Sequence, residues 1–209
     1  MVLGLFWLGL STAAAGGTTL PPDTVTRPVH AFMHFLPEYL EVRYPEKQFG
    51  QFVYIAIRQQ RLFLIDSNRV VDEYPISTSR FGVGNRIYSK QTPEGLHTIR
   101  QKVGRHIPEG GIIYRGSYTG RSCLSDSGTV VRMGNLITSR ILRLHGEEQG
   151  VNRGGRQDTF SRFIYIHGTA NEALIGTPAS NGCIRMCNAD VVELFNRIPE
   201  GTYVVILNN

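Results

Sequence analysis

The chain has 209 residues, of which 41% are hydrophobic and 19% are charged. These values are typical of a folded globular protein, and they exclude an intrinsically disordered chain and a protein made of many membrane spans. The 22 Lys and Arg residues exceed the 17 Asp and Glu residues, so the formal net charge of +5 suits an anionic partner, such as nucleic acid, a membrane surface or a cell-wall polymer.

Residues 1–22 carry no charged side chain. An apolar run from Val2 to Leu10 precedes the small residues Ser11 to Gly16, which predicts a secretory signal peptide over residues 1–15 with cleavage near Ala15. The run is shorter than the roughly 20 apolar residues that a membrane span requires. Because the basic residues that usually open a signal peptide are missing, a buried N-terminal element is the alternative.

Residues 16–50 are expected to form a linker or a segment that packs on the following domain. Thr and Pro dominate residues 18–28 without periodicity, as in a linker. Pro37 and Pro45 are expected to interrupt any helix in the rest of this segment. A single domain is therefore expected over residues 51–209.

Beyond residue 51 the sequence shows short runs of branched and aromatic residues between turn residues, which predicts strands. The chain also has 23 Gly, more than the usual share, and this indicates many turns. We therefore expect a mainly β fold with a few short helices. The expected strands are 52–57, 61–65, 70–78, 95–99, 141–145, 162–167 and 202–207.

One helix is expected near the C-terminus. Asn188 is placed to cap it, and Asp190 lies in the first turn, where the helix dipole favours an anion. Apolar residues then recur at the spacing of a buried helix face. They are Val191, Leu194, Phe195 and Ile198. Pro199 and Gly201 end the expected helix.

A candidate catalytic pair begins with the strand that ends in His167. Sixteen positions further on, Cys183 follows Gly182, and a loop of this length can fold back to bring the thiol and the imidazole together. A Cys–His pair is the minimum for a thiol nucleophile, because the imidazole takes the thiol proton and returns it to a leaving group. Gly182 allows a tight turn whose amides face an oxyanion. Arg185 can favour the thiolate or hold a substrate carboxylate.

These residues also have ordinary structural explanations. A lone Cys among apolar neighbours is commonly a buried small hydrophobe, and a His at a strand end is commonly structural. Cys183 and Cys187 with a distant His make only a weak zinc pattern, so we expect no metal and no cofactor. Three cations beside a Gly-rich loop, Arg153, Arg156 and Arg162, are expected to be solvated at the surface, and the rim of a cleft that meets an anionic glycan is the alternative.

The motifs around the candidate pair make a family resemblance specific. They are IHGT at 166–169, SNGCIRM at 180–186 and GTYVVI at 201–206, with weaker upstream motifs YPISTS at 74–79 and TPEG at 92–95. Over roughly residues 52 to 207, the sequence resembles the L,D-transpeptidase family with the YkuD-type catalytic domain. The resemblance implies a YkuD-like β-sandwich or open barrel over residues 51–209, with the Cys–His site in a cleft.

The resemblance also implies an exported enzyme, periplasmic or associated with the cell wall, that acts on peptidoglycan stem peptides. Cys183 would attack the carbonyl of the third stem residue, release the terminal D-amino acid and hold the acyl group as a thioester. His167 would be the base, oriented by the backbone carbonyl of Gly168. The acyl group would then pass to an amine of another stem peptide or of an attached lipoprotein, or to water.

The loop before the nucleophile has implied roles as well. Asn181, Gly182 and Cys183 would supply the amides of the oxyanion hole, while Ser180 and Arg185 would shape the pocket. The family's commonest pattern has His where this chain has Asn181. Three functions therefore stay open: acyl transfer, hydrolysis by a cell-wall L,D-carboxypeptidase or amidase with the same pair, and peptidoglycan binding with impaired catalysis.

Further features bear on partners and on the compartment. His145, in a second His-Gly pair on an apolar strand, is interpreted as a structural or cleft residue, or as a contact with the acceptor. If Cys183 stays free in an oxidising compartment, Cys123 and Cys187 are left as a candidate disulfide pair. No basic stripe interleaved with aromatics supports nucleic-acid binding. We expect no stable membrane span, and the sequence leaves the oligomeric state open.

Overall fold

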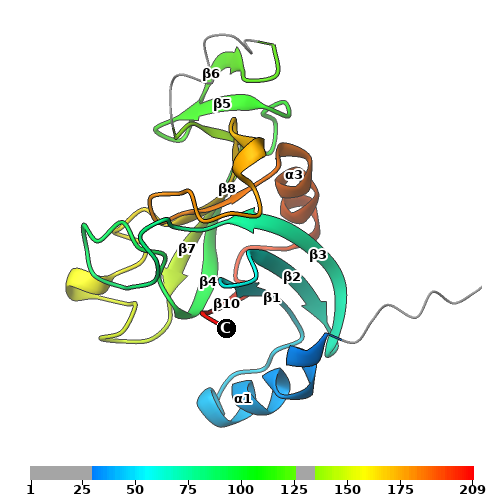
Figure 1. Cartoon of the computed structure of the whole chain (residues 1–209), viewed down its shortest axis with the longest axis vertical. Coiled ribbons are helices and arrows are strands. Elements are labelled where there is room, and N and C mark those ends of the chain that lie inside the picture. The colour runs from blue at the N-terminus through cyan, green and yellow to red at the C-terminus, as the bar shows by residue number, and fades with distance from the viewer. Residues whose placement is uncertain (1–29, 126–134) are drawn as a thin grey trace, which may run out of the picture.

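The structure is a computed structural model that describes residues 30–125 and 135–209 (Figure 1). The expected signal peptide, residues 1–15 with cleavage near Ala15, lies outside the described residues. Within the two described ranges, no helix combines the length and the apolar character that a membrane crossing requires.

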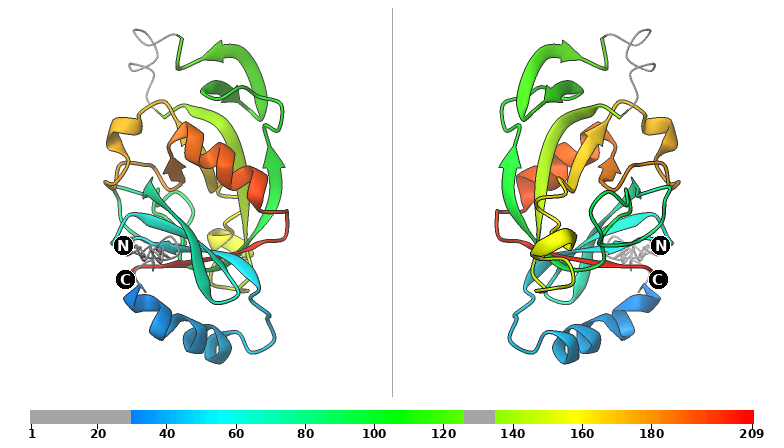
Figure 2. Two further views of the ribbon diagram at one scale, coloured as in Figure 1. Left: turned by 90° about the vertical axis from the view of Figure 1, so that its right-hand side faces the viewer. Right: turned by 90° about the vertical axis from the view of Figure 1, so that its left-hand side faces the viewer.

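The described residues contain ten strands in one sheet, in the order β4-β10-β1-β2-β3-β9-β8-β7-β5-β6. β4 also pairs with β7, so the strands from β4 to β7 in this order form a closed ring, from which the hairpin β5–β6 extends (Figures 1 and 2). The mainly β class expected from the sequence is confirmed. The strands are β1 (Gln51–Ala56), β2 (Arg61–Asp66), β3 (Arg69–Ser77), β4 (Gly95–Val103), β5 (Gly111–Tyr114), β6 (Ser117–Ser122), β7 (Ile137–Gly146), β8 (Tyr165–Thr169), β9 (Ile184–Met186) and β10 (Tyr203–Leu207).

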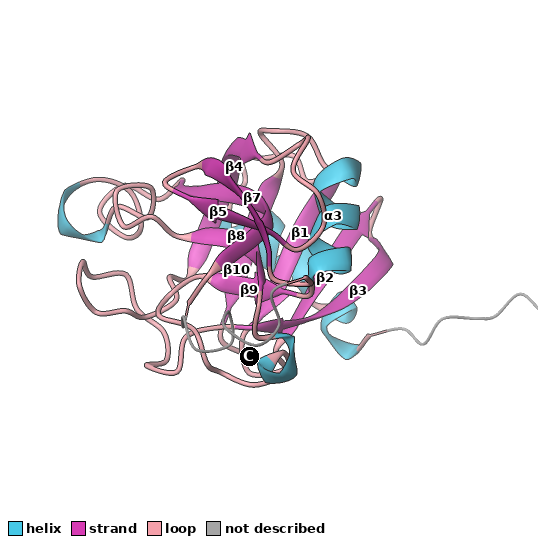
Figure 3. Cartoon of the chain, turned by 90° about the horizontal axis from the view of Figure 1, so that it is seen from above, coloured by secondary structure: helices cyan, strands magenta, loops and turns pink. Residues whose placement is uncertain are grey.

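Two α-helices and short 3-10 turns accompany the described strands. They are η1 (Ala31–His34), α1 (Leu36–Arg43), η3 (Gly155–Gln157), η4 (Glu172–Leu174) and α3 (Asn188–Arg197). Seen from above, the strands surround the interior, and α3 lies among them on one side (Figure 3).

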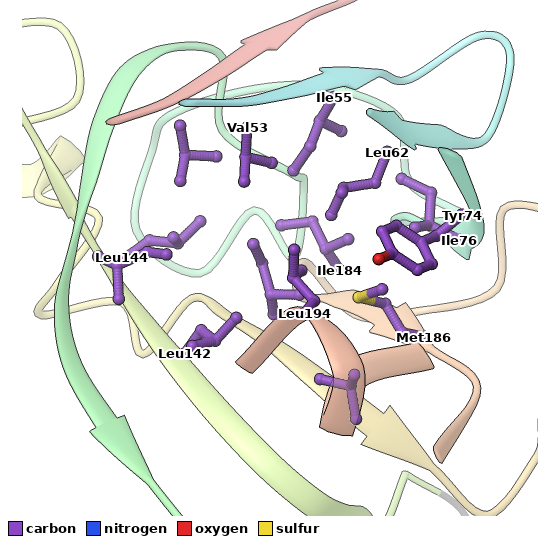
Figure 4. Close-up of a cluster of buried hydrophobic side chains, with 14 of the residues drawn as sticks. Val53, Ile55, Leu62, Tyr74, Ile76, Leu142, Leu144, Ile184, Met186 and Leu194 are labelled. Carbon is purple, nitrogen blue, oxygen red and sulfur yellow. The ribbon is translucent and has the colours of Figure 1, made fainter. Parts of the chain in front are cut away.

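The alternation of side chains assigns the two faces of β1 to two separate cores. Val53 and Ile55 point into the ring and pack with apolar residues of β7, β9 and α3 (Figure 4). Phe52 and Tyr54 point outward into a second apolar cluster, which includes the N-terminal helix. Because both faces are covered, the strand reads as a nearly continuous apolar run.

Helix α1 covers the outward face of this part of the sheet (Figure 2). Its buried residues Leu36 and Leu40 belong to the second cluster. Pro37 lies in the first turn, where a proline removes no helical hydrogen bond, and the helix ends at Arg43 before Pro45. The expectation that these prolines interrupt any helix is therefore wrong, since they lie at its two ends.

Helix α3 was expected from the sequence, but its cap differs. The N-cap is Cys187, not Asn188, and the amide of Val191 donates to the Cys187 carbonyl oxygen at 3.0 Å. The side-chain oxygen of Asn188 instead accepts from the hydroxyls of Thr138 and Ser139 on β7, each at 2.6 Å. This residue therefore joins the first turn of α3 to β7.

The strands β5, β6 and β9 were not expected from the sequence. β6 is polar and largely exposed, so it lacks the alternation that marks a half-buried strand, and β9 has only 3 residues. β8 begins at Tyr165, later than expected, because Phe163 has a φ of 56°, a left-handed conformation that interrupts an extended run.

Candidate active site

The candidate site lies on the face of β8 and β9 that points away from the interior. Ile166 and Ile184 pair across these parallel strands and are fully buried in the interior cluster. Because side chains alternate along a strand, the next pair, His167 and Arg185, lies on the opposite face. His167 also pairs with Ile141 of β7, so the imidazole belongs to a strand with neighbours on both sides.

His167 is held in one orientation. Its Nδ1 is 2.7 Å from the carbonyl oxygen of Gly168, which only accepts, so Nδ1 carries the proton and Nε2 is the basic nitrogen. The residue is 4% exposed; this burial lowers its pKa to about 4, and the charge of Arg185 acts in the same direction. A Cβ on Gly168 would lie 2.7 Å from the carbonyl oxygen of Thr138, so the backbone there has room for glycine only.

Cys183 directly precedes β9, and alternation from Ile184 places its thiol on the face of His167. Sγ donates to the carbonyl oxygen of Phe163 at 3.4 Å, and no hydrogen bond joins it to His167 among the described residues. Burial raises the pKa of the thiol to about 11, opposed by the guanidiniums of Arg185 and Arg162. Near neutral pH the thiol and the imidazole are therefore both uncharged.

The loop before the nucleophile is a tight turn held by its own side chains. Ser180 Oγ donates to the carbonyl oxygen of Cys183 at 2.6 Å and accepts from the amide of Gly182 at 3.1 Å. Gly182 has a φ of 122°, which would strain any other residue, and its carbonyl oxygen accepts from the Thr92 hydroxyl at 3.0 Å. The Gly182 amide expected for an oxyanion is thus used within the turn. The amides of Asn181 and Cys183 are the remaining candidates.

Two arginines border the site: Arg80, which the sequence did not single out, and Arg162, which was expected at the surface. Arg80 Nη2 donates to Asn181 Oδ1 at 3.0 Å, which fixes the side chain at this position. Arg162 donates to the carbonyl oxygens of Gln91 at 2.6 Å and of Gly84 at 3.1 Å. It is therefore partly buried, not solvated as expected. No sequence signal marks this role, because both acceptors are backbone atoms far away in the chain.

Other candidates from the sequence do not join the pair. His145 lies four residues beyond Ile141 on β7, on the same face of the strand. Its ring contacts that of Phe160 edge-on, with ring centroids 6.1 Å apart. All three cysteines are free thiols, so Cys123 and Cys187 do not form the disulfide considered from the sequence. In residues 30–125 and 135–209, no group of His, Cys, Asp and Glu side chains is arranged to hold a metal ion.

A groove of about 630 Å³ lies near the site, although neither Cys183 nor His167 lines it. Phe163, whose carbonyl accepts from Cys183, and Tyr165 line it together with residues of β4, β5 and β7. Because Ile141 pairs with His167 and also lines the groove, the groove lies on the same face of the sheet as His167, and Ile113, Arg115 and Gly116 of the hairpin β5–β6 form part of it.

Comparisons with known proteins give one family. The family model of the YkuD L,D-transpeptidase catalytic domain matches residues 50–206. The Bacillus subtilis (strain 168) protein YqjB, which bears an L,D-transpeptidase name, is 51% identical over 51 residues, or 24% of this chain and 29% of YqjB. YkuD of the same strain, named likewise, is 58% identical over 41 residues, or 20% of this chain and 25% of YkuD. Each aligned stretch thus spans under a third of the relative.

Solved structures of more distant proteins also align with the chain. An L,D-transpeptidase of Xylanimonas cellulosilytica is 19% identical with a TM-score of 0.45, covering 82% of this chain and 68% of that one. An L,D-transpeptidase from Mycobacterium smegmatis is 14% identical with a TM-score of 0.46, covering 76% and 58%.

Proposed function

The chain belongs to the L,D-transpeptidase family with the YkuD-type catalytic domain, and we propose that it is itself a cysteine-dependent peptidoglycan L,D-transpeptidase. It would transfer an acyl group from a stem tetrapeptide through a Cys183 thioester to an amine, in crosslinking or remodelling of the cell wall. The observation that carries the proposal is the fixed tautomer of His167, whose basic Nε2 has no hydrogen-bond partner among the described residues and lies on the face of the sheet that bears the thiol.

In the first half-reaction, Cys183 is the nucleophile and His167 the base. Rotation about χ1 turns Sγ from the Phe163 carbonyl toward Nε2, which takes the thiol proton as sulfur attacks the carbonyl carbon of the third stem residue. The amides of Asn181 and Cys183 stabilise the oxyanion. The C–N bond breaks, the terminal D-amino acid leaves with the proton from His167, and the thioester remains.

In the second half-reaction, an amine attacks the thioester carbonyl. His167 takes the proton of the attacking amine and returns it to the departing sulfur, so the free thiol is restored. Water in place of the amine gives a carboxylic acid, and the net reaction is then hydrolysis. Acceptor choice therefore decides between a transferase and a carboxypeptidase that use the same two residues.

The substrate places the activity outside the cytoplasm. Peptidoglycan stem peptides lie in the periplasm or the cell wall, which agrees with the expected signal peptide at residues 1–15. The net charge of +5 favours approach to an anionic polymer.

The test uses the purified protein and muropeptides that carry tetrapeptide stems. We expect crosslinked dimers and a covalent adduct whose mass equals the donor without its terminal D-amino acid, both absent in Cys183→Ala and reduced by several orders of magnitude in His167→Gln. Cys187→Ala is the control, since this half-buried thiol lies at the cap of α3. Trimmed monomers would indicate a hydrolase, and full activity of Cys183→Ala would overturn the mechanism.

A further inference from the structure

The groove that Phe163 and Tyr165 line also contains two arginines. Arg143 of β7 and Arg115, in the turn between β5 and β6, line it, and no Asp or Glu of residues 30–125 and 135–209 is among the lining residues. Most other lining side chains are apolar or aromatic. A ligand that fits this lining has an apolar chain and a negatively charged group.

Arg143 is held in place by aromatic rings and not by a carboxylate. Its guanidinium lies 4.2 Å from the ring centroid of Phe160, 5.6 Å from that of Tyr165 and 5.9 Å from that of Phe163. Its Nη1 donates to Gln101 Oε1 at 2.9 Å. In the described ranges no acidic side chain forms an ion pair with it, so its charge is oriented but not neutralised.

The position of Arg143 relative to the catalytic pair follows from the strand register. Arg143 pairs with Tyr165, and Ile141 pairs with His167, so Arg143 lies two residues along the same face of the sheet. Continued back by one residue, the parallel register of β8 and β9 sets Cys183 level with Tyr165, which pairs with Arg143. Two strand spacings, roughly 10 Å, therefore separate the backbone of Cys183 from that of Arg143. The long side chain of Arg143 shortens this span, so a donor carboxylate several bonds from the reacting carbonyl would meet the guanidinium while the carbonyl lies at the thiol.

We propose that this groove is a subsite for a free carboxylate of the acyl donor, with Arg143 as its anchoring cation and Arg115 as a second, exposed one. The inference rests on the proposed function and deepens it by naming the donor class. Two carboxylates of a stem peptide have the required reach: that on the side chain of the diamino acid under attack, and that of the residue before it. A guanidinium recognises either through paired charge-assisted hydrogen bonds, whereas an amide in the same place loses the charge.

The experiment compares three donor tetrapeptides: one with both carboxylates free, one amidated on the diamino acid, and one amidated on the preceding residue. The readouts are the rate constant for thioester formation, by mass spectrometry, and the Kd for Cys183→Ala, by calorimetry. We expect one of the two amidated donors to lose about tenfold to hundredfold in both readouts, and that donor identifies the carboxylate.

Variants separate recognition from a structural role. Arg143→Gln should react with and bind the free donor as poorly as the amidated one, so that the discrimination disappears, and Arg143→Lys should keep part of it. Arg115→Gln, in an exposed turn, should reduce the discrimination without affecting folding. Arg100→Gln is the matched control, because Arg100 lies over the same Phe160 ring at 4.7 Å but does not line the groove.

The outcomes distinguish this inference from the proposed function. Equal rates and affinities for the three donors, or discrimination that persists in Arg143→Gln, would overturn the subsite while thioester formation still supports the enzyme. Carboxylate-dependent binding to Cys183→Ala without any thioester in the wild type would support the subsite and overturn the enzyme. No binding of any donor together with no thioester in the wild type would overturn both.

Discussion

Burial sets the protonation states on which the proposed reaction depends. It lowers the pKa of His167 to about 4 and raises the pKa of Cys183 to about 11. A neutral imidazole is the form that accepts a proton, so the base is available throughout the range between these values. The thiolate then forms only while substrate is attacked, since neither group is charged in the resting state.

The pH profile of acylation should show this arrangement. We expect the acid limb of the rate constant for thioester formation near pH 4, because His167 stays neutral above its lowered pKa. An exposed histidine would place the limb near pH 6.5. The rate is measured by mass spectrometry from pH 3.5 to 9, with circular dichroism at each pH to confirm folding. A limb near pH 6.5 would contradict a buried, neutral base.

At the scale of elements, α1 is attached to the barrel by polar as well as apolar contacts. The Tyr44 hydroxyl donates to Glu148 at 2.9 Å, and Arg43 pairs with the same carboxylate. Glu148 also accepts from the amide of Leu96 on β4 at 2.7 Å. Burial, reinforced by this carboxylate, raises the pKa of Tyr44 far above its ordinary value. One side chain thus joins the N-terminal helix, β4 and the loop after β7.

Substitutions on the two sides of α1 should differ in cost. Leu40 is 3% exposed and belongs to the outer cluster, so Leu40→Ala should lower the free energy of unfolding by about 2–5 kcal/mol. Val42 is 76% exposed on the same helix, and Val42→Ala should change it by less than about 0.5 kcal/mol. Urea denaturation measures both. If Leu40→Ala lowers the free energy of unfolding as little as Val42→Ala does, α1 does not unfold together with the barrel.

At the scale of the whole molecule, closure of the barrel buries a second histidine. His97 of β4 is fully buried, with Nδ1 3.0 Å from the carbonyl oxygen of Gly95 and Nε2 3.1 Å from the Thr159 hydroxyl. Burial lowers its pKa to about 4, as it does that of His167. Neither ring takes a proton in the folded state near pH 5, although an unfolded histidine does.

Stability should therefore fall on the acid side of neutrality. Between pH 6.5 and about 4, His97 and His167 bind protons in the unfolded chain but not in the folded protein. Falling pH therefore stabilises the unfolded state relative to the folded state and lowers the free energy of unfolding. Each histidine contributes roughly 3 kcal/mol over this window. Urea unfolding at several pH values measures the slope, which His97→Asn should reduce. The exposed His106→Asn is the control, and an unchanged slope in His97→Asn would contradict the assignment.

Local patterns predicted those parts of the fold that their own residues specify. Continuous apolar runs mark β1 and β2 because both faces of each strand are covered by a core. The spacing of apolar residues at the helical period marks α3, because one face of the helix is buried. β6 and β9 were missed, since one has no buried face and the other is shorter than any periodic signal.

By itself, the sequence determined the mainly β class, the course of α3 and the two residues, Cys183 and His167, on which the proposed chemistry rests; their roles stay predictions. Only the tertiary structure decided that Gly182 uses its amide within the turn, that Arg162 is partly buried beside the thiol, and that Arg143 faces the groove. The physical reason is the separation along the chain over which each kind of interaction acts. Periodicity and turn residues act within a few positions, whereas burial, charge and hydrogen-bond partners are set by strands that pair across most of the chain.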